Sequence, residues 1–567
     1  MAQAANADVY DYVVIGSGFG GSISAMRLTE KGYHVLVLER GRRFRDEDFA
    51  RSNWNVWRYI WLPAARCFGI LQISPFRDVF VLHGAGVGGG SLGYANVLMA
   101  PGEAMFTAPA WRRLADWKQI LAPHFKTARR MLGVAHNPRL WPADARLREI
   151  AGELGQSDTF QPTQVGTFFG APGREGEEAP DPYFSGQGPV RRGCTHCGGC
   201  LVGCRHNAKN TLVKNYLYFA EKWGAQIQAE AQVSDIRPLP ENQPDRARYE
   251  VIYRRSTAWY WAPERRIRAR NVICAAGALG TLRLLFRCRD VTRSLPRLSP
   301  RLGDLVRTNN EALLGVTNRG TDVDCSQGIA ITSIFHADAV TTVEPVRYPA
   351  GSDLMRLLQG PLIEAGSVAQ RLWQSLRDFV RRPGDFLITH VRPGWAKRST
   401  ILLVMQTEES RIKLRFGRSF FTLWRRNLVS QADAQQTIPG QSRLGHQVTR
   451  RLAQKTGGIP AGTINEGLLG ISMTAHILGG CPFGLDSGQG VVDLDCQVHH
   501  YPGLYVVDGS IMPANPGVNP SLTIAALADY AMSRVPAVPG RARPPLEFGP
   551  ASAPMSPAPA ADDERTP

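Results

Sequence analysis

Four of the ten cysteines lie in one short segment, Cys194-Thr-His-Cys197-Gly-Gly-Cys200-Leu-Val-Gly-Cys204. The spacing C-x2-C-x2-C-x3-C is that of bacterial ferredoxins, in which thiolates hold iron–sulfur clusters. In ferredoxins, however, Pro follows the fourth cysteine, which ligates a second cluster, whereas here Arg205 follows and no second set of four cysteines exists. The segment leaves three interpretations open: an iron–sulfur cluster, a zinc ion, or free structural thiols.

A glycine-rich turn near the start of the chain has the residue types that bind a dinucleotide. It follows a short β-branched run and precedes a helical pattern and a second apolar run, 35–38. Gly16 permits a tight turn, Gly18 lets the backbone approach a pyrophosphate, and Gly21 lets the helix pack closely. Glu39 then lies where a ribose hydroxyl would bind. The sequence predicts a dinucleotide-binding βαβ unit, with a purely structural turn as the alternative.

A second glycine cluster distinguishes between dinucleotides. It reads Gly84-Ala-Gly86-Val-Gly88-Gly89-Gly90-Ser91 and is too irregular for a second Rossmann fingerprint. So many glycines indicate a flat group pressed against the backbone, and the isoalloxazine ring of a flavin is such a group. The cluster therefore favours FAD over NAD.

Several segments of the sequence resemble those of the glucose-methanol-choline (GMC) oxidoreductases. They are these glycine segments, Ala275-Ala-Gly277-Ala-Leu-Gly280-Thr281, and the segments containing His476 and Asn519. Within that superfamily the sequence is most similar to the bacterial cholesterol oxidases that bind FAD non-covalently. The resemblance implies an α/β fold: a Rossmann-like FAD-binding domain with a discontinuous α+β substrate-binding cap. The FAD domain would comprise residues 8–110, 190–290 and 465–537, and the cap residues 111–189 and 291–464. The Pro- and Ala-rich residues 538–567 predict a disordered tail.

The resemblance also implies which residues contact FAD and which act on the substrate. His476 would hydrogen-bond a substrate hydroxyl and accept its proton, since a neutral imidazole titrates near working pH, and Asn519 would contact the alcohol or the flavin. A buried core histidine is the alternative for His476. The implied FAD contacts are Gly16, Gly18, Gly21, Glu39, Gly86, Gly88, Gly89, Gly90, Ser91, Asn96, Asp508 and Gly509.

Glu344, five residues before Pro349-Ala-Gly351, is the third catalytic candidate. In the sterol oxidases that the chain resembles, a Glu at this place lines the steroid pocket and moves a proton during double-bond isomerisation. An apolar site would raise the pKa of such a carboxyl and make it a better base. A structural ion pair with Arg347 is the alternative.

Composition narrows the range of partners. The chain carries 66 Lys and Arg against 49 Asp and Glu, a formal charge of +17, but no nucleic-acid-binding motif. An anionic membrane surface is therefore the expected partner of this charge. Two patterns would provide the contact: Trp54, Trp57 and Trp61 on one face of a helix, and an apolar helical face over residues 368–380. Because neither a spanning segment nor a secretory leader is recognisable, we expect a cytoplasmic protein, peripheral at the membrane.

These interpretations combine into one leading function and two alternatives. The leading one is oxidation of the 3β-hydroxyl of cholesterol or a related sterol to the ketone, followed by Δ5 to Δ4 isomerisation, with O2 as electron acceptor. The first alternative is a dehydrogenase of another bulky lipophilic alcohol that passes electrons through an iron–sulfur cluster to a protein or quinone. The second is a lipid-binding flavoprotein without turnover. Covalent attachment of FAD stays open, with His83 as the residue to inspect.

Overall fold

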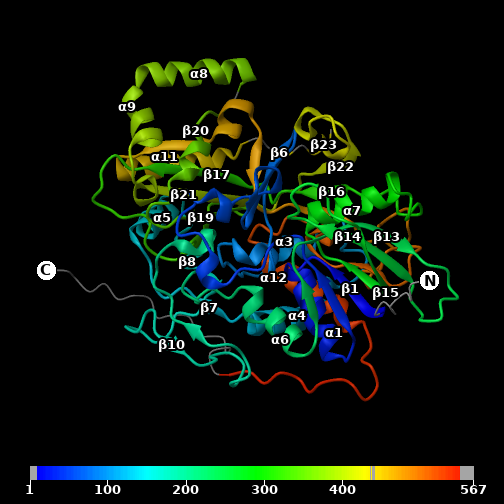
Figure 1. Ribbon diagram of the computed structural model, residues 1–567. Helices are drawn as coiled ribbons and strands as arrows, with labels where there is room; N and C mark the ends of the chain where they lie inside the picture. The colour runs from blue at the N-terminus through cyan, green and yellow to red at the C-terminus, as the bar shows by residue number, and fades with distance from the viewer. Residues whose placement is uncertain (1–8, 365, 434–435, 437, 439–440, 550–567) are drawn as a thin grey trace.

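Two large sheets organise the computed structural model, which describes residues 9–364, 366–433, 436, 438 and 441–549 (Figure 1). The first sheet has seven strands, five of them joined in parallel and two added in antiparallel fashion. In spatial order its strands are β12 (Gln226–Gln228), β2 (Val35–Leu38), β1 (Val9–Ile15), β15 (Arg265–Cys274), β14 (Tyr249–Arg255) and β13 (Ala231–Pro238), with β27 (Leu504–Val506) also paired to β15.

The predicted βαβ unit lies at the centre of this sheet. Gly16 follows β1 directly, and glycine is required there: its φ is +98°, and a Cβ would lie 2.4 Å from the carbonyl oxygen of Ala275. Helix α1 (Phe19–Glu30) follows and packs on α12 (Ser521–Ser533) near the other end of the chain. Arg27 of α1 donates from Nε to Asp529 of α12 at 2.7 Å. The first and last parts of the described chain thus form one layer.

The second sheet forms the roof of the substrate side. Helices α5 (Pro142–Glu153) and α11 (Arg443–Thr456) cover its outer face, where Leu147, Phe335 and Val448 share one buried cluster. Its seven strands are, in order, β20 (Gln359–Pro361), β24 (Ile459–Thr463), β17 (Ala312–Thr317), β21 (Ser399–Gln406), β19 (Thr341–Val346), β18 (Ser333–His336) and β8 (Gln161–Pro162).

Parts of the expected cap join the core of the nucleotide-binding half instead. Trp117 of α4 (Trp117–Met131) and Leu302 are buried in the same cluster as β1 and α1. So is Leu414, which lies in a further, four-stranded sheet. Its strands are β23 (Asn427–Ala432), β22 (Ile412–Gly417), β16 (Asp304–Arg307) and β26 (Leu478–Gly480). The buried core of the nucleotide-binding half therefore includes side chains from residues 111–189 and 291–464.

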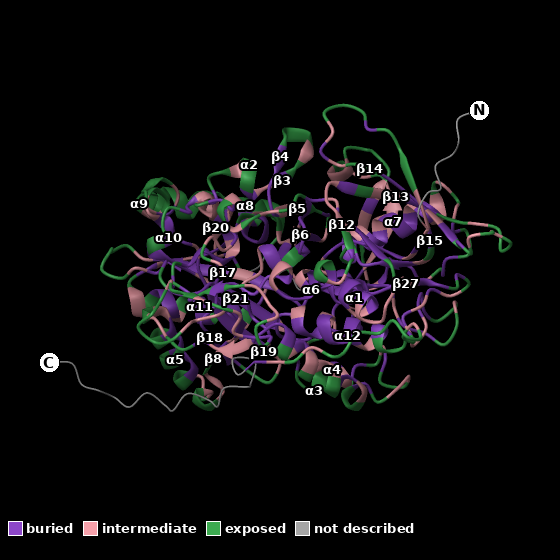
Figure 2. Cartoon of the chain, turned by 60° about the horizontal axis from the view of Figure 1, so that its bottom comes forward, coloured by how far each residue is buried: buried purple, intermediate pink, exposed green. Residues whose placement is uncertain are grey.

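The chain after α12 has two parts. Residues 538–549, expected to belong to a disordered tail, lie in defined positions: the amide of Val538 donates to Lys31, that of Arg543 to Glu30, and that of Gly549 to Tyr183. Residues 550–567 lie outside the described residues. Burial concentrates at the centre of the molecule, around α1, α12 and the adjoining strands (Figure 2).

Two helices project from the top of the molecule in Figure 1: α8 (Val368–Arg381) and the short α9 (Pro383–Phe386). The helical pattern predicted over residues 368–380 is thus present. The aromatic helix expected at residues 54–61 is not, because α2 covers only Val56–Tyr59 and Trp61 is buried on β3 (Trp61–Leu62). Within the described ranges, no helix combines the length and the apolar character that crossing a bilayer requires.

Candidate active site

A cavity of about 890 Å³ lies between the two large sheets. Its floor is the glycine turn after β1, and its roof includes residues of β17, β19 and β21. At Gly18, Gly90 and Gly277 an added Cβ would meet no atom within 4 Å, so backbone is open to the cavity there. Of the predicted FAD contacts, those that line the cavity are Gly16, Gly18, Glu39, Gly89, Gly90, Asp508 and Gly509.

The two glycine clusters form one cradle. A Cβ on Gly89, whose φ is +54°, would lie 2.5 Å from the Cα of Gly18, so the second cluster rests directly on the first. The amide of Gly88 donates to the hydroxyl of Ser17 at 3.0 Å. Backbone N–H groups at the start of α1 face the same space, which is the arrangement that binds a pyrophosphate. The cradle fits the phosphates and the flat ring of FAD.

Glu39 is buried at the end of β2, where a ribose would bind. Its carboxylate accepts from the amide and hydroxyl of Ser17 at 3.0 and 2.8 Å and from the amide of Gly41 at 2.8 Å. Arg40, the next residue, also lines the cavity, and burial lowers its pKa, an effect that Glu39 opposes. Sequence reasoning missed Arg40, although its position directly after the predicted acid was a usable signal.

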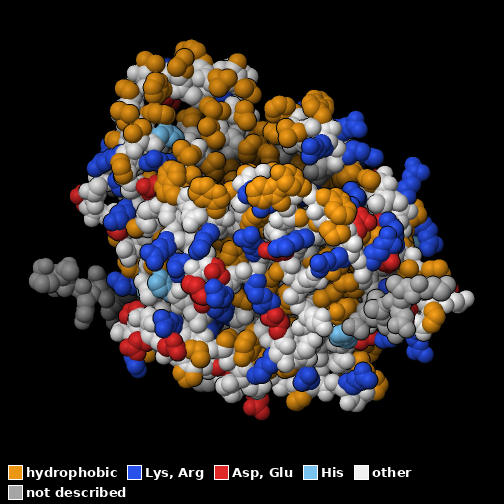
Figure 3. Space-filling view, viewed as in Figure 1, with side chains coloured by type: hydrophobic (Ala, Val, Ile, Leu, Met, Phe, Trp, Pro, Cys, Tyr) orange, Lys and Arg blue, Asp and Glu red, His pale blue; other side chains and the backbone are white. Residues whose placement is uncertain are grey.

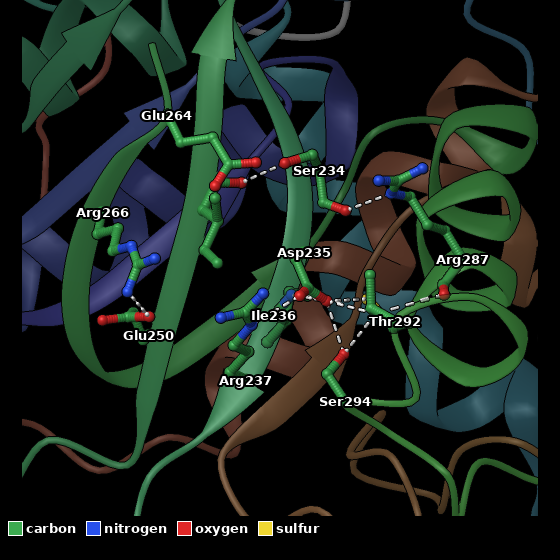
Figure 4. Close-up of polar contacts among 12 residues, drawn as sticks. Ser234, Asp235, Ile236, Arg237, Glu250, Glu264, Arg266, Arg287, Thr292 and Ser294 are labelled. Atoms are coloured by element: carbon green, nitrogen blue, oxygen red, sulfur yellow. Dashed lines mark hydrogen bonds and ion pairs between the residues drawn. The ribbon is translucent and has the colours of Figure 1, made fainter.

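The far end of the cavity is held by polar contacts between β13 and α7 (Ala278–Asp290), shown in Figure 4. The carbonyl of Ser234, a lining residue, accepts from Arg287 Nε at 2.9 Å. Next to it, Asp235 accepts hydroxyl hydrogen bonds from Thr292 and Ser294 at 2.8 and 2.6 Å. These bonds hold the end of α7, and the residues that follow it, against β13, which bounds the cavity.

The remaining predicted contacts do not line this cavity. Gly21, Gly86, Gly88 and Ser91 lie behind its wall, where Ser91 accepts from the amide of Leu212 at 3.1 Å. Asn96 faces the opposite way: it lines a second cavity, next to the four clustered cysteines. Its neighbours along the chain, Ala95 and Val97, line the large cavity. Sequence spacing alone did not reveal on which side of this wall Asn96 lies.

His476 lines the large cavity and is held by a residue that the sequence did not indicate. Its Nδ1 lies 3.1 Å from Oε2 of Glu311, which is 2% exposed and also accepts from Thr474 Oγ1 and the amide of Ala475. A carboxylate only accepts, so this network assigns the imidazole proton to Nδ1 and leaves Nε2 free to take a proton. Glu311 precedes His476 by 165 positions, and no local pattern links them.

Asn309 joins His476 to the loop that carries Asn519. Its side-chain amide donates to the carbonyl of Val518 at 3.0 Å, its Oδ1 accepts from the amide of Gly517 at 2.9 Å, and its Nδ2 lies 3.4 Å from His476 Nδ1. Asn519 itself lines the cavity and is 6% exposed. The two predicted residues are thus brought to one place by a third, which sequence reasoning also missed.

Glu344 is completely buried on β19, next to this pair. Burial raises the pKa of its carboxyl to about 8, an effect opposed by the nearby side chain of Asn519 and reinforced by the charge of Glu311. Val346, two residues along the strand and therefore on the same face, lines the cavity. Arg347 points elsewhere: it donates to Thr332 Oγ1 at 2.6 Å and lies 3.9 Å from Asp144. A Glu344–Arg347 ion pair is therefore not what holds this carboxyl.

His83, the residue to inspect for covalent FAD, also lines the cavity. Its Nε2 lies 2.9 Å from the hydroxyl of Ser74. Burial, with help from the charges of Arg40 and Arg283, lowers the pKa of His83 well below its usual range, so the ring is neutral.

The four clustered cysteines line the second cavity, of about 380 Å³. Cys194 and Cys200 are buried, Cys204 is half-buried and Cys197 is exposed. Over the described part of the chain, no three His, Cys, Asp or Glu side chains converge closely enough to hold a single metal ion. This geometry disfavours the zinc interpretation.

Comparison with known proteins places this geometry in a family. Residues 439–528 match the model of the GMC oxidoreductases, and residues 14–45 match that of an NAD(P)-binding Rossmann-like domain. The chain is 45% identical to a cholesterol oxidase of Acinetobacter baumannii over 93% of this chain and 94% of that one. It is 46% identical to a cholesterol oxidase of Mycobacterium tuberculosis (strain H37Rv), over 93% and 91% respectively.

The solved structure of pyridoxine 4-oxidase from Mesorbium loti shares the fold, with a TM-score of 0.55 at 17% identity, over 93% of this chain and 99% of that one. The matches confirm the predicted α/β class, with its Rossmann-like domain and its second domain. Together with the extent of the two sequence likenesses, they show that the chain belongs to the GMC oxidoreductase family.

Proposed function

We propose that this protein oxidises the 3β-hydroxyl of cholesterol or a related sterol to the ketone and moves the double bond from Δ5 to Δ4. The observation that carries the proposal is the meeting of His476, Asn519 and Glu311 at one cavity, with the buried carboxyl of Glu344 next to Asn519. The two relatives at 45% and 46% identity, both cholesterol oxidases, support the choice of substrate.

The chain's own residues divide the proton chemistry between them. Nε2 of His476 takes the hydroxyl proton, and the Glu311 carboxylate stabilises the imidazolium that forms. Asn519 orients the alcohol next to it. When bound in the glycine cradle, FAD supplies the acceptor for the hydride. Glu344 then carries a proton between two carbons of the steroid, a task that suits a carboxyl whose pKa lies near working pH.

The walls of the cavity fit a bulky lipophilic substrate. Next to the catalytic residues the lining is mostly aliphatic, although β21 adds Ser399 and Thr400, while Tyr59 and Trp395 add aromatic surface. Such walls bind a rigid hydrocarbon through buried apolar area and leave the hydroxyl as the group that is recognised by hydrogen bonds. The aliphatic lining there is formed by Leu313, Ile331, Val346, Ile401 and Leu403.

The direct test is an anaerobic visible spectrum of the purified flavoprotein before and after adding detergent-solubilised cholesterol. We expect the oxidised-flavin band to bleach, and admission of O2 to restore it with one peroxide formed per ketone. A flavin that stays oxidised with cholesterol but bleaches with a long-chain alcohol would retain the oxidoreductase and reject the sterol.

We also propose that the enzyme meets its substrate at an anionic membrane surface, through an exposed apolar rim. The rim comprises side chains of α8 (Leu372, Trp373, Leu376, Phe379 and Val380) and of the β22–β23 hairpin tip (Phe420, Leu423 and Trp424), each at least 47% exposed. Figure 3 shows these two regions at the top of the molecule as hydrophobic surface with basic side chains beside it. The exposed basic residues on the same two segments are Arg377, Arg381, Arg382, Arg418, Arg425 and Arg426.

The attachment of α8 is consistent with this role. Arg371 is the one side chain of the helix that is buried, and it donates to the carbonyls of Gly366 and Glu466 at 2.9 and 3.1 Å. The rest of the helix has an apolar face without a cover among the described residues. Apolar side chains beside arginines are the composition that binds the interface of an anionic bilayer.

Flotation with vesicles tests this surface. The full chain should bind vesicles of phosphatidylcholine and phosphatidylglycerol, more weakly at high salt. Replacing Trp373, Phe379 and Trp424 together with Ser should weaken binding by about tenfold or more, because each buried aromatic side chain contributes about 1.5–3 kcal/mol.

A matched control is Leu485→Ser, which also removes an exposed apolar side chain (67% exposed) but lies near Phe483 and α4, at the other end of the molecule. Equal vesicle binding by the triple variant and the wild type would refute the rim. The rim would also be refuted if the triple variant lost vesicle binding only because it self-associates. Size-exclusion chromatography at rising protein concentration reports such self-association.

A further inference from the structure

We propose that the second cavity is the binding site of one four-iron, four-sulfur cluster, held by Cys194, Cys197, Cys200 and Cys204. All four cysteines line a single cavity of about 380 Å³. In the ferredoxin pattern the fourth cysteine is directed to another cluster, but here the chain brings Cys204 back to the same space as the first three. The structure thus supplies the complete set of four cysteine ligands that a single cluster needs.

The loop has a backbone that wraps around a central group. Gly198 and Gly203 have φ of +70° and +94°, and His196 has φ of +54°. A Cβ on Gly198 would lie 2.3 Å from the carbonyl oxygen of Ser326, so glycine is required there. Two backbone amides are directed at the sulfurs: that of His196 lies 3.4 Å from Cys194 Sγ, and that of Ala330 hydrogen-bonds Cys200. Amide hydrogen bonds to sulfur are a means by which proteins tune such clusters.

The size of the cavity distinguishes a cluster from a single ion. The volume that the thiols line is too large for one ion, and no three of the candidate ligands described converge on a point. Asn96 also faces this cavity with a buried side-chain oxygen that has no hydrogen-bond partner. The cavity is therefore lined by four sulfurs, has one polar atom without a partner and is larger than a single ion needs.

The electrostatics of the cavity suit a cluster of net negative charge. Lys209 is fully buried in the wall, and Arg51 and Arg205 line the opening. Among the described residues that line this cavity there is no Asp or Glu. A buried lysine is costly unless a negative group lies near it. Four thiolates around an iron–sulfur core provide such a group.

The wall between the two cavities is a single layer of residues. Leu201 lines the flavin cavity while Cys200 and Val202, on either side of it, line the cysteine cavity. Likewise, Tyr348 lines the flavin cavity and its neighbour Pro349 lines the cysteine cavity. Lys209 fastens this wall, since its Nζ donates to the carbonyls of Leu92, Tyr94 and Cys200 at 2.8–2.9 Å.

A cluster at this position gives the two electrons taken from the alcohol a second way out. They would leave one at a time through the cluster to a one-electron carrier protein that docks near the exposed Cys197, and two protons would go to water. Each turnover would then reduce two carrier molecules and form no peroxide.

The first test uses the full chain, expressed with added iron, purified without oxygen and analysed for iron and acid-labile sulfide. We expect about four of each per chain, and an electron paramagnetic resonance signal after reduction by dithionite. Cys200→Ser should lose most of the iron. The matched control Cys288→Ser should keep it, because Cys288 is a buried thiol on α7 that donates to Asp235, far from both glycine clusters in sequence.

Other results of the metal analysis would overturn the cluster. Zinc without sulfide, or a chain that takes up neither iron nor sulfide after anaerobic reconstitution with Fe²⁺ and sulfide while its flavin is present, would overturn the proposal. The electron route is tested separately by anaerobic reduction of cytochrome c with sterol as donor. A rate that is the same with and without the cluster would overturn the route. Because the metal analysis requires no sterol, its result is independent of the substrate assignment.

Discussion

Replacing His476 with Gln is expected to slow substrate oxidation by about 10²- to 10⁴-fold while FAD stays bound. Gln keeps a polar group at the cavity wall but cannot take the hydroxyl proton, and His476 is the imidazole whose Nε2 is left free for that proton by the bond to Glu311. The measurement is the rate of flavin bleaching in anaerobic stopped flow at saturating sterol.

The control for this variant is His500→Gln, an exposed histidine that contacts Ser487 outside the cavity. A His476→Gln enzyme that bleaches at the wild-type rate would remove His476 from the chemistry. Glu311→Gln separates positioning from catalysis: it should slow bleaching less than His476→Gln does, because the imidazole is kept but loses the carboxylate that holds its Nδ1.

Replacing Glu344 with Gln should leave oxidation largely intact and abolish the second step, so that the 5-en-3-one accumulates. Glu344 acts as a base only when ionised, and its pKa of about 8 means that about a tenth of it is ionised at pH 7. In the wild type, the isomerisation rate should therefore rise about tenfold per pH unit up to about pH 8 and then level off. Ultraviolet absorbance of the conjugated 4-en-3-one, followed separately from peroxide formation, measures it.

Stability provides the control for the same variant. A carboxyl whose pKa is raised on folding favours the folded state below its unfolded pKa, and this contribution is lost as the pH rises towards 8. Above pH 8, Glu344→Gln should consequently unfold at a temperature no lower than the wild type. If this well-folded variant still forms the 4-en-3-one at the original rate, Glu344 has no part in isomerisation.

Local physical chemistry made the nucleotide-binding unit predictable. Gly16, Gly18 and Glu39 belong to one βαβ unit whose spacing is set by the shape of a dinucleotide, so the local sequence places them. The same holds for the amphipathic pattern of α8, which depends only on helical periodicity.

The rest of the site depends on tertiary contacts that leave no mark on neighbouring residues. Glu311 and Asn309 reach His476 from more than 160 positions away, and nothing in their local sequence indicates this. Asn96 lines the second cavity while Ala95 and Val97 line the first, and spacing does not indicate which way each residue of this segment faces. Trp61 fitted a helical spacing but lies on a strand, since the helix ends at Tyr59.

The pairing of α1 with α12 determines when this enzyme can acquire its cofactor. Arg27 and Asp529 are separated by 502 positions, and the backbone of Val507 lies directly against Gly20 in the cradle. At about 5–20 residues per second, a ribosome needs about 25–100 s to synthesise the chain between them. Throughout that interval the first βαβ unit lacks the helix that covers it. The cavity that would hold FAD, whose lining includes Asp508 and Gly509, is therefore complete only when nearly the whole chain has been synthesised.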